Sequence, residues 1–579
     1  MEINKLTFNK LKKMSKDVNN DFEKISIAFL GDTATQLLCQ ALKGYGALRK
    51  YNFDIFEAEY DSIENTIFDE NSKLYSEDHD YCILYMSSEK LYDSFLNMTM
   101  EERILFAENY IKYIKNNWDI ISKRSQSKII QFNFIEINDS VFGNYTNKVK
   151  SSFLYQIRKL NLMIMDLVCE YKNVFILDIS SIQNIYGRCN TFDDKYYYSA
   201  RLALSIETIP AVAKNVTDII CATKGKIKKC VIVDLDNTLW GGVIGDDGID
   251  NIQVGELGSG RVFTDLQNYL KELKKRGIIL AVCSKNNEKT AKEPFIKHPD
   301  MVLKLEDISI FVANWENKAD NIINIQKTLN IGMDSIVFLD DNVFEREMVR
   351  KIIPDIMVPE LPEDPGEYVK YLRELNIFET ASYSKEDSER TKQYQTEIKR
   401  KKSEELYTSI DEYLKSLHMV SKVYEFTKFN YPRISQLSQR SNQFNLRTIR
   451  YTEKEIQQIR ESDKYITLSF ELGDKFGNYG LISSVILEKK DKETLFIDTW
   501  FMSCRVLKRS MEEFIVNTIM QEAKERGFLR VIGEYIPTKK NSMVKNIYAE
   551  MGFEKIKENL FESHVHNYKN KITYIEMEN

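Results

Sequence analysis

The stretch Cys230-Val-Ile-Val-Asp-Leu-Asp-Asn-Thr-Leu-Trp240 decides the fold of the central part of this chain. Its first four residues form a short apolar run of strand length, and two carboxylates and a hydroxyl follow at once. Open α/β sheets bind ligands at the carboxyl edge of their strands. Two aspartates two positions apart repel each other unless a cation lies between them, and carboxylate oxygens suit Mg²⁺. The run therefore predicts a metal-assisted phosphoryl-transfer site in which an aspartate attacks phosphorus.

Further polar residues follow the other strands of the same block, which we expect at 230–234, 278–283, 301–305 and 335–340. Ser284 ends the second strand and offers a hydroxyl to a phosphoryl oxygen. Lys318 offers an ammonium that balances the charge of the phosphate and of the nucleophile. Asp340 and Asp341 end the last strand and complete a hard oxygen shell for Mg²⁺.

The spacing of these motifs bears on the size of the substrate. Fewer than fifty residues separate Asp236 from Ser284, and a helix predicted over 262–276 takes up part of them. No large cap domain fits in that interval. An uncapped site accepts a phosphorylated group carried on a protein, although a neighbouring domain can also act as a lid.

This ordered set of motifs resembles the haloacid-dehalogenase (HAD) superfamily of aspartyl phosphotransferases. The resemblance implies that Asp234 is the nucleophile and a metal ligand. It implies that Asp236 is the general acid/base and also ligates the metal through its backbone carbonyl. The other implied residues hold the phosphate or the metal: Thr238, Ser284 and Lys318 for the phosphate, and Asp340 and Asp341 for the metal. The resemblance also implies that Lys318 is a catalytic residue.

Longer stretches resemble one branch of that superfamily, the FkbH-like proteins of HAD phosphatase class IIIC. These stretches are Leu-Trp-Gly-Gly-Val-Ile-Gly-Asp-Asp-Gly (239–248), Cys-Ser-Lys-Asn-Asn (283–287), Asn-Trp-Glu-Asn-Lys-Ala-Asp-Asn-Ile (314–322) and Phe-Leu-Asp-Asp-Asn-Val-Phe-Glu-Arg (338–346). The resemblance continues to about residue 555 and is weaker before residue 225. Val343 stands where the family usually has proline, which changes loop stiffness more than chemistry.

The resemblance implies an enzyme that loads a glyceryl unit from 1,3-bisphosphoglycerate onto an acyl carrier protein with loss of phosphate, in polyketide or related biosynthesis. The implied cofactors are Mg²⁺ and the phosphopantetheine arm of the carrier. One alternative is a phosphatase acting on a small or carrier-bound phosphoester, with the C-terminal domain only docking the carrier. A second alternative is a non-catalytic scaffold of a biosynthetic complex, which the intact set of aspartates and Lys318 disfavours.

The C-terminal part is an α+β pattern, with strands expected at 465–472, 480–488, 494–502 and 530–534 and helices at 509–526 and 542–551. It resembles the N-acetyltransferase (GNAT) fold, but Lys508 and Ser510 replace the two glycines of that fold's pyrophosphate-binding turn. This departure puts CoA binding in doubt and does not exclude a shorter phosphopantetheine arm. Cys504, at a strand end, is a candidate acyl relay. Cys283 is its rival, but strand alternation directs it away from the phosphate site.

The N-terminal part alternates strands, expected at 25–30, 81–85, 129–134 and 174–177, with helical segments. Phe29-Leu-Gly-Asp-Thr33 resembles the Gly-Asp-Ser turn of SGNH esterases, with Thr33 in the nucleophile position. The corresponding late segment, 192–198, contains no histidine, and none lies between His79 and His298. Without a base the hydroxyl is not activated. We expect a non-catalytic docking domain in which Asp32 and Thr33 serve as a capping turn.

Bulk properties set the remaining expectations. The chain has 579 residues, a net charge of −6, a pI near 5.8 and eight cysteines without a C-x-x-C pair. The charge argues against nucleic-acid binding, and the cysteine pattern favours a reduced, cytoplasmic protein. Because no apolar stretch approaches about 18–20 residues and the N-terminus has no uninterrupted apolar segment, we expect neither a membrane span nor a signal peptide. We expect an α/β protein with four parts: an SGNH-like three-layer domain (1–224), a HAD Rossmann-like domain with a minimal cap (225–375), a charged helical connector (376–420) and a GNAT-like α+β domain (421–579). The oligomeric state is left open.

Overall fold

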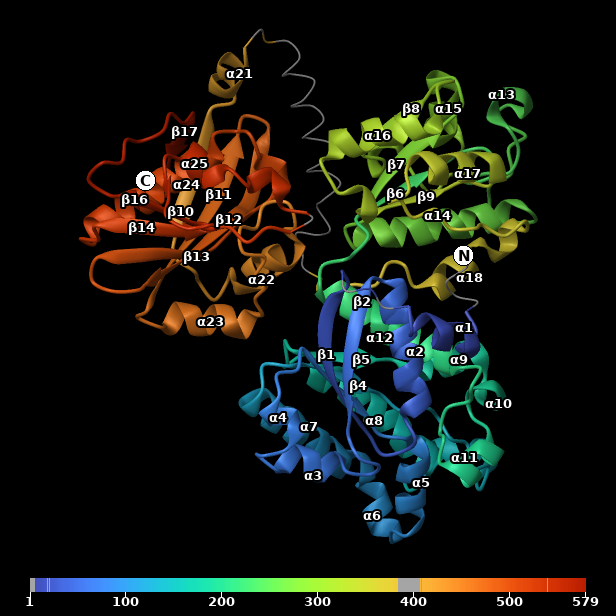
Figure 1. The fold of residues 1–579 in the computed structure, drawn as a ribbon. Coiled ribbons are helices and arrows are strands. Elements are labelled where there is room, and N and C mark those ends of the chain that lie inside the picture. The colour runs from blue at the N-terminus through green and yellow to red at the C-terminus, as the bar shows by residue number, and fades with distance from the viewer. Residues whose placement is uncertain are drawn as a thin grey trace. The chain divides into compact units, whose positions relative to one another are not determined.

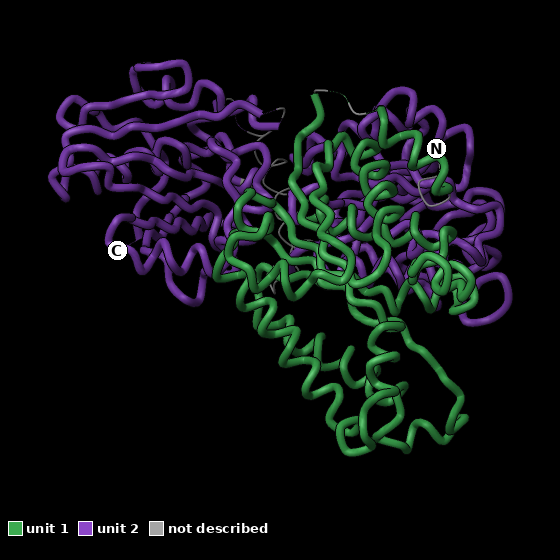
Figure 2. The backbone as a smooth tube through the Cα atoms, turned by 60° about the horizontal axis from the view of Figure 1, so that its bottom comes forward, with its two compact units in different colours: residues 1–222 green, residues 223–579 purple. Residues whose placement is uncertain are grey.

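The computed structural model describes residues 6–17, 19, 21–383, 407, 409–538 and 540–578. The chain divides into two compact units, residues 1–222 and 223–579 (Figure 2). Most of the predicted connector, residues 384–406 and 408, lies outside the described residues, and its described end is helix α21 (Ile410–Ser416). Within the described ranges, no helix combines the length and apolar character needed to span a membrane.

Unit 1 is built on a parallel five-stranded sheet with the order β2-β1-β3-β4-β5 (Figure 1). Its strands are β1 (Glu23–Gly31), β2 (Tyr51–Glu57), β3 (Tyr81–Tyr85), β4 (Lys128–Phe132) and β5 (Val174–Leu177). Ile27 and Phe29 of β1 enter one apolar cluster, and Ala28 and Leu30 enter another. Strand alternation thus gives the sheet two buried faces, as a three-layer α/β fold requires.

Helices form the outer layers of unit 1. They are α1 (Phe8–Met14), α2 (Gln36–Leu48), α3 (Ile63–Phe68), α4 (Lys73–Ser76), α5 (Ser88–Leu96), α6 (Met100–Ile104), α7 (Phe106–Arg124), α8 (Phe153–Val168), α9 (Ile179–Tyr186), α10 (Arg188–Thr191), α11 (Asp194–Ala200) and α12 (Ile209–Thr223). The four strands predicted here are confirmed. The sequence pattern did not indicate β2, an edge strand in which only Tyr51 and Phe53 are fully buried.

The first sheet of unit 2 has four parallel strands in the order β8-β7-β6-β9. They are β6 (Cys230–Val233), β7 (Ile279–Ser284), β8 (Ile310–Ala313) and β9 (Ile336–Leu339). Val231 and Val233 of β6 face one apolar cluster and Ile232 faces the other. The helices are α13 (Ile244–Asp247), α14 (Gly260–Lys275), α15 (Glu288–Lys297), α16 (Lys318–Leu329), α17 (Val343–Ile352) and α18 (Tyr368–Leu375).

The predicted strand at 301–305 is wrong, because the third strand of this sheet is β8. The side-chain oxygen of Gln267 accepts hydrogen bonds from the amides of Val302 and Leu303, at 3.0 and 3.1 Å. These amides are therefore satisfied by a side chain instead of a neighbouring strand. The apolar residues of the segment, such as Leu303, are buried in the core without strand pairing.

The second sheet of unit 2 has eight strands in the order β15-β16-β14-β13-β12-β11-β10-β17. They are β10 (Met419–Tyr424), β11 (Tyr465–Asp474), β12 (Gly477–Lys489), β13 (Thr494–Met502), β14 (Arg530–Glu534), β15 (Glu554–Lys555), β16 (Leu560–His564) and β17 (Ile575–Met577). The pairs β10–β11, β11–β12 and β12–β13 are antiparallel, and β13–β14 is parallel. Its helices are α22 (Tyr431–Arg440), α23 (Glu453–Glu461), α24 (Met511–Glu525) and α25 (Ile547–Glu550).

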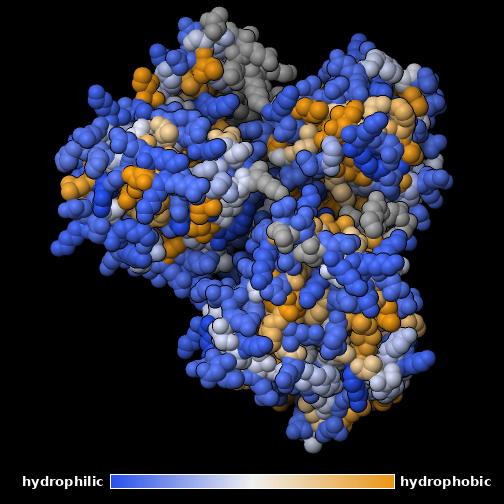
Figure 3. All heavy atoms as spheres, viewed as in Figure 1, coloured by the Kyte–Doolittle hydropathy of each residue, from blue (hydrophilic) through white to orange (hydrophobic). Residues whose placement is uncertain are grey.

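The mixed α/β class predicted from the sequence is confirmed by these sheets and helices. Helix α24 begins two residues later than expected, and the predicted closing helix at 542–551 is a short 3-10 turn followed by α25. Figure 3 shows a largely hydrophilic surface on which apolar side chains form small patches.

Candidate active site

Strands β6 and β9 place the acidic residues of the site next to each other. They are neighbours in the sheet, with Val233 paired to Leu339, so Asp234 and Asp340 both follow at its carboxyl edge. The amide of Asp234 donates a 2.9 Å hydrogen bond to the carbonyl of Leu339. One carboxylate oxygen from each of Asp234, Asp340 and Asp341 lies within 4.8 Å of the others. Three of the predicted residues therefore form one oxygen cluster.

Lys318, the first residue of α16, inserts its ammonium into this cluster. Its Nζ lies 2.9 Å from Oδ2 of Asp234 and 2.7 Å from Oδ2 of Asp340, and all three side chains are buried. Burial alone would lower the pKa of Lys318, but the two carboxylates together raise it. Burial and the charge of Asp234 raise the pKa of Asp340 to about 7, against the opposing effect of Lys318. Burial and Asp234 also raise the pKa of Asp341.

The second oxygen of Asp234 is free of such contacts. Oδ1 is buried and makes no hydrogen bond with any described residue. A buried carboxylate oxygen without a partner is costly and needs a ligand to offset its desolvation. This oxygen, beside Asp340 and Asp341, fits the hard oxygen shell of Mg²⁺.

Asp236 has its side chain outside this cluster, and three donors hold its carboxylate. Oδ1 accepts from the indole nitrogen of Trp240 at 2.9 Å and from the amide of Ile244 at 3.0 Å. Oδ2 accepts from the side-chain amide of Asn286 at 2.8 Å. Asn286 is a candidate site residue that the sequence did not single out, although the predicted motif 283–287 contains it. These contacts fix the orientation of Asp236 before substrate arrives.

The two predicted hydroxyl groups lie on either side of the site. Ser284, the last residue of β7, is buried, and its Oγ lies 3.2 Å from the side-chain nitrogen of Asn286. Thr238 donates a 3.1 Å hydrogen bond to Oδ1 of Asp341 and accepts one of 3.1 Å from the amide of Asp341. The Thr238 hydroxyl therefore positions Asp341 in this structure, and the predicted phosphate-binding role would require it to turn.

Arg346 is a second residue that sequence reasoning did not single out. It is buried on α17, and its Nη1 donates to the carbonyl oxygens of Asp340 and Asp341 at 2.8 and 2.6 Å. It thereby holds the loop that carries both aspartates. The signal was present in the motif 338–346, which ends on this arginine.

The two candidate relay cysteines lie in different surroundings. Cys283 is buried in the apolar cluster on the face of Ile232, and burial raises its pKa to about 12. Cys504 is partly exposed in the turn after β13, and its carbonyl accepts a 2.8 Å hydrogen bond from Asn330. Asn330 follows the C-terminus of α16, so the length of this helix, roughly 18 Å at 1.5 Å per residue, separates Cys504 from Lys318.

The turn before α24 already contains a carboxylate. Lys508 and Ser510 have positive φ angles of 60° and 55°. The amide of Lys508 donates to Oε1 of Glu512 at 3.2 Å, and Ser510 Oγ accepts from the amide of Tyr574 at 3.0 Å. The buried side chain of Glu512 thus takes a backbone donor that a bound pyrophosphate would need. This arrangement disfavours CoA binding at the turn.

In unit 1 the prediction that Asp32 and Thr33 serve as a capping turn is wrong. Both oxygens of Asp32 lie 2.9–3.0 Å from the amide of Ser87, so Asp32 ties the turn after β1 to the turn after β3. Thr35, the residue before α2, makes no side-chain capping bond. The prediction of a capping turn failed because Asp32 finds its partner 55 residues away along the chain.

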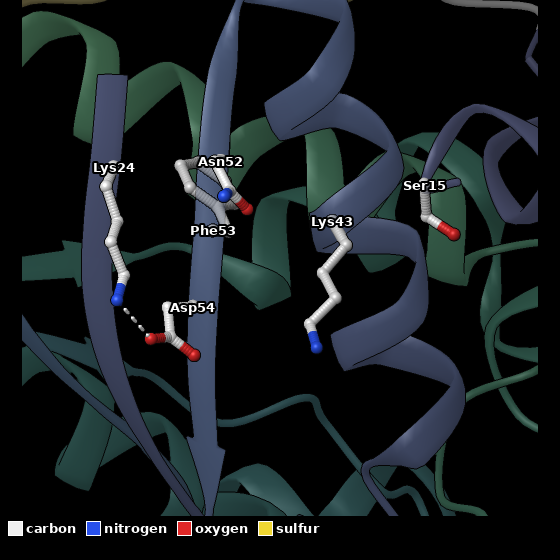
Figure 4. Close-up of a pocket in the computed structure, with 6 residues that line it drawn as sticks. All are labelled: Ser15, Lys24, Lys43, Asn52, Phe53 and Asp54. Carbon is white, nitrogen blue, oxygen red and sulfur yellow. Dashed lines mark ion pairs between the residues drawn. The ribbon is translucent and has the colours of Figure 1, made fainter. Parts of the chain in front are cut away.

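A polar hollow of about 360 Å³ lies on the surface of unit 1 beside the edge strand β2 (Figure 4). Lys24 forms a 2.9 Å ion pair with Asp54 there, and Lys43 of α2 also lines the hollow. Both lysines are exposed to solvent. Surface charges of this kind are well hydrated and do not by themselves form a binding site.

Comparisons with known proteins agree with the geometry of the phosphatase site. The family model described as FkbH, N-terminal domain, matches residues 26–221. A crystal structure of the N-terminal part of the protein BF1531 from Bacteroides fragilis, containing a phosphatase domain complexed with Mg, is 49% identical at a TM-score of 0.63. The match covers 65% of this chain and 100% of that chain. Since unit 1 is only 222 of the 579 residues, the match also includes a large part of unit 2. No curated protein matches the chain.

The parallel sheet of β6–β9 and its aspartate–lysine cluster define a HAD-type phosphatase domain. Given the match over the whole Bacteroides fragilis chain at 49% identity and the FkbH model over unit 1, the chain belongs to the FkbH-like family.

Acetyltransferase structures align with a quarter of the chain. The ribosomal-protein-S18-alanine N-acetyltransferase from Escherichia coli is 11% identical and covers 25% of this chain and 94% of its own, at a TM-score of 0.21. The GNAT domain of S. lividans PAT is 15% identical and covers 24% and 89%, at 0.20. Such scores say nothing about what the C-terminal part binds.

Proposed function

We propose that the chain is a Mg²⁺-dependent phosphatase acting on a three-carbon unit that is loaded onto an acyl carrier protein. The phosphatase part of this proposal rests on the surroundings of the two carboxylate oxygens of Asp234. One of its oxygens is held by Lys318, and the other is buried, unpaired and beside two further aspartates. This is the arrangement that a metal-assisted carboxylate nucleophile needs.

The residues present fit the metal. Asp234, Asp340 and Asp341 would supply carboxylate oxygens, and the backbone carbonyl of Asp236 is a further ligand implied by the family. When bound, Mg²⁺ neutralises the phosphoryl oxygens so that an anionic nucleophile can approach. The phosphatase domain of the Bacteroides fragilis protein was crystallised with Mg, which supports this assignment.

The proposed reaction uses residues of this chain in two steps. Asp234 attacks phosphorus, the bond from phosphorus to the substrate oxygen breaks, and Asp236 donates a proton to that oxygen. Asp236 then takes a proton from water, which attacks the aspartyl phosphate and releases inorganic phosphate with Asp234 restored. Lys318 and the hydroxyls of Ser284 and Thr238 hold phosphoryl oxygens through both steps.

The acyl half of the proposal concerns 1,3-bisphosphoglycerate. A thiolate attacks the acyl carbon, a C–S bond forms, and the bond from carbon to the phosphate oxygen breaks, releasing one phosphate. The phosphoester at the other end of the unit is then hydrolysed at Asp234. The thiol belongs to the phosphopantetheine arm of a carrier protein, either directly or through a cysteine relay. Partial exposure favours Cys504 as the relay, since Cys283 is buried with a raised pKa.

Incubation of the full-length protein with a holo carrier protein and 1,3-bisphosphoglycerate, followed by intact-mass analysis, tests the proposal. A glyceryl gain on the carrier supports loading. Phosphate release alone supports the second candidate, a phosphatase whose C-terminal part only docks the carrier, and no change supports a scaffold. Peptide mapping of any adduct on the enzyme decides between Cys504 and Cys283, and an adduct on neither removes the relay.

A further inference from the structure

Buried polar groups with few hydrogen-bond partners gather in unit 1 at the carboxyl ends of β1 and β3. Thr33 follows β1, and Ser88 and Glu89 form the first turn of α5 after β3. All three residues are buried, with at most 5% of the residue surface exposed. In the part of the chain that the structure describes, the hydroxyl of Ser88 makes no hydrogen bond, the hydroxyl of Thr33 has only that of Tyr85 beside it, and the carboxylate of Glu89 has an ion pair with Arg188 but no further hydrogen bond.

The two turns that carry these groups lie side by side. Strands β1 and β3 are neighbours in the sheet, with Gly31 paired to Tyr85. The bonds between Asp32 and the amide of Ser87 join the two turns directly. Thr33 and Glu89 are therefore held on one rigid edge, which is where parallel sheets bind their ligands.

A cation and an aromatic pair complete the cluster. Nη1 of Arg188 lies 3.0 Å from Oε1 of Glu89, and the guanidinium stacks over the ring of Phe192 at 4.4 Å. The hydroxyl of Tyr85 is close enough to Thr33, Glu89 and Arg188 for all three to act on its pKa. The Arg188 side chain is 32% exposed while that of Glu89 is 6% exposed, so the arginine is the partner that solvent reaches.

Burial without hydrogen bonds is energetically unfavourable. Each unpaired buried polar group costs about 1–3 kcal/mol, and folded proteins leave few of them. Several such atoms within two adjacent turns indicate a site at which a bound ligand supplies the missing hydrogen bonds. The unpaired oxygen of Asp234 marks the phosphatase site of unit 2 in the same way.

The charges of the cluster restrict the ligand. A phosphate dianion is disfavoured, because Asp32 and Glu89 contribute carboxyl groups and Glu89 already offsets the charge of Arg188, whose remaining N–H donors can still bind a carbonyl. Hydroxyl groups of a ligand can donate hydrogen bonds to the carboxylate of Glu89 and can donate to or accept from the hydroxyl of Thr33. A carbonyl or a single carboxylate of the ligand can accept hydrogen bonds from Arg188.

We propose that unit 1 binds a small, unphosphorylated hydroxy acid or hydroxyacyl group, with its hydroxyls on Glu89 and Thr33 and its carbonyl end on Arg188. The existence of this site does not depend on the proposed function. The choice of glycerate as the probe does rest on it, since glycerate is the three-carbon unit after removal of phosphate.

Titration calorimetry of D-glycerate into the full-length Asp234→Asn protein, without Mg²⁺, tests the site apart from phosphatase turnover. We expect saturable binding that weakens at least tenfold in Glu89→Gln and in Thr33→Val, and at least tenfold weaker binding of 3-phosphoglycerate. Glu170→Gln, which removes an exposed carboxylate of unit 1 paired with Lys115, is the matched control and should bind normally.

Absence of heat with D-glycerate overturns the proposal, and so does binding that both variants leave unchanged. If Glu89→Gln does not fold, as judged by circular dichroism, Ser88→Ala and Thr33→Val carry the test, because both keep the ion pair of Glu89 with Arg188. Phosphate release by the wild-type protein tests the proposed function separately, so either idea can fail without the other.

Discussion

The side-chain amide of Asn286 donates a 2.8 Å hydrogen bond to Oδ2 of Asp236. The same amide nitrogen lies 3.2 Å from Oγ of Ser284, so one residue joins the proposed acid/base to a proposed phosphate-binding hydroxyl. With the indole of Trp240 on the opposite oxygen, Asp236 has little freedom to rotate. The rate of proton transfer should therefore depend on this amide as well as on Asp236 itself.

Asn286→Ala should lower kcat for phosphate release about 10- to 100-fold, with a smaller change in KM, because it disorients the proton donor without removing it. Steady-state phosphate release measures both constants. Asn324→Ala, an exposed position on α16, is the control and should behave like the wild type. An unchanged kcat would show that the amide does not position Asp236.

Lys318→Met should destabilise the protein by about 3–5 kcal/mol in metal-free buffer, because it leaves Asp234 and Asp340 buried and facing each other without a cation. Thermal unfolding with and without Mg²⁺ measures this effect. We expect Mg²⁺ to recover part of the lost stability and none of the activity. Lys289→Met, at an exposed position, is the control. Equal melting temperatures for wild type and Lys318→Met without metal would contradict the pairing.

Removal of divalent metal with EDTA should abolish phosphate release, and Mg²⁺ should restore it, whereas the larger Ca²⁺ should restore it poorly because it favours more ligands and longer distances. The melting temperature should rise with added Mg²⁺ in the wild type and much less in Asp340→Asn. Full activity in EDTA would show that phosphate release does not require a divalent metal.

Glu512 should make the stability of the C-terminal part depend on pH. Burial raises its pKa from an ordinary 4.5 to about 7, although backbone hydrogen bonds oppose the shift. The folded state thus binds this proton more tightly than the unfolded state. The corresponding stability is complete below about pH 4.5 and is lost as pH rises through about 7, an effect of order 3 kcal/mol.

Glu512→Gln should therefore be more stable relative to the wild type at pH 8 than at pH 5. Calorimetric melting of the full chain at both pH values measures the difference. Glu525→Gln, an exposed carboxylate of the same helix, should show no such trend. A constant difference between wild type and Glu512→Gln across this range would contradict the buried-carboxyl interpretation.

Local sequence patterns are sufficient to predict site residues where polar residues directly follow a buried strand. For this reason the sequence alone predicts that Asp234, Ser284 and Asp340 lie together. The failures concern contacts between distant segments. The segment 301–305 looks like a strand, but Gln267 on α14 satisfies its amides, and Asp32 finds Ser87 instead of capping α2. No local pattern encodes such partners.

Two residues of the candidate site were not predicted from the sequence, for a related reason. Asn286 and Arg346 lie inside conspicuous sequence motifs, yet their roles follow only from which oxygen each one reaches. The roles proposed for Thr33 and Glu89 are likewise invisible in sequence, because burial and the scarcity of hydrogen-bond partners are properties of the folded edge of the sheet.

Phosphate release by Asp234→Asn, compared with Asp320→Asn at an exposed position of α16, shows most directly whether Asp234 is the nucleophile. The substitution keeps the shape of the side chain but removes the nucleophilic oxygen. We predict that Asp234→Asn folds like the wild type and releases less than about 1% as much phosphate, while Asp320→Asn remains active. Turnover by Asp234→Asn above a few per cent of the wild-type rate would contradict the assignment of Asp234 as the nucleophile.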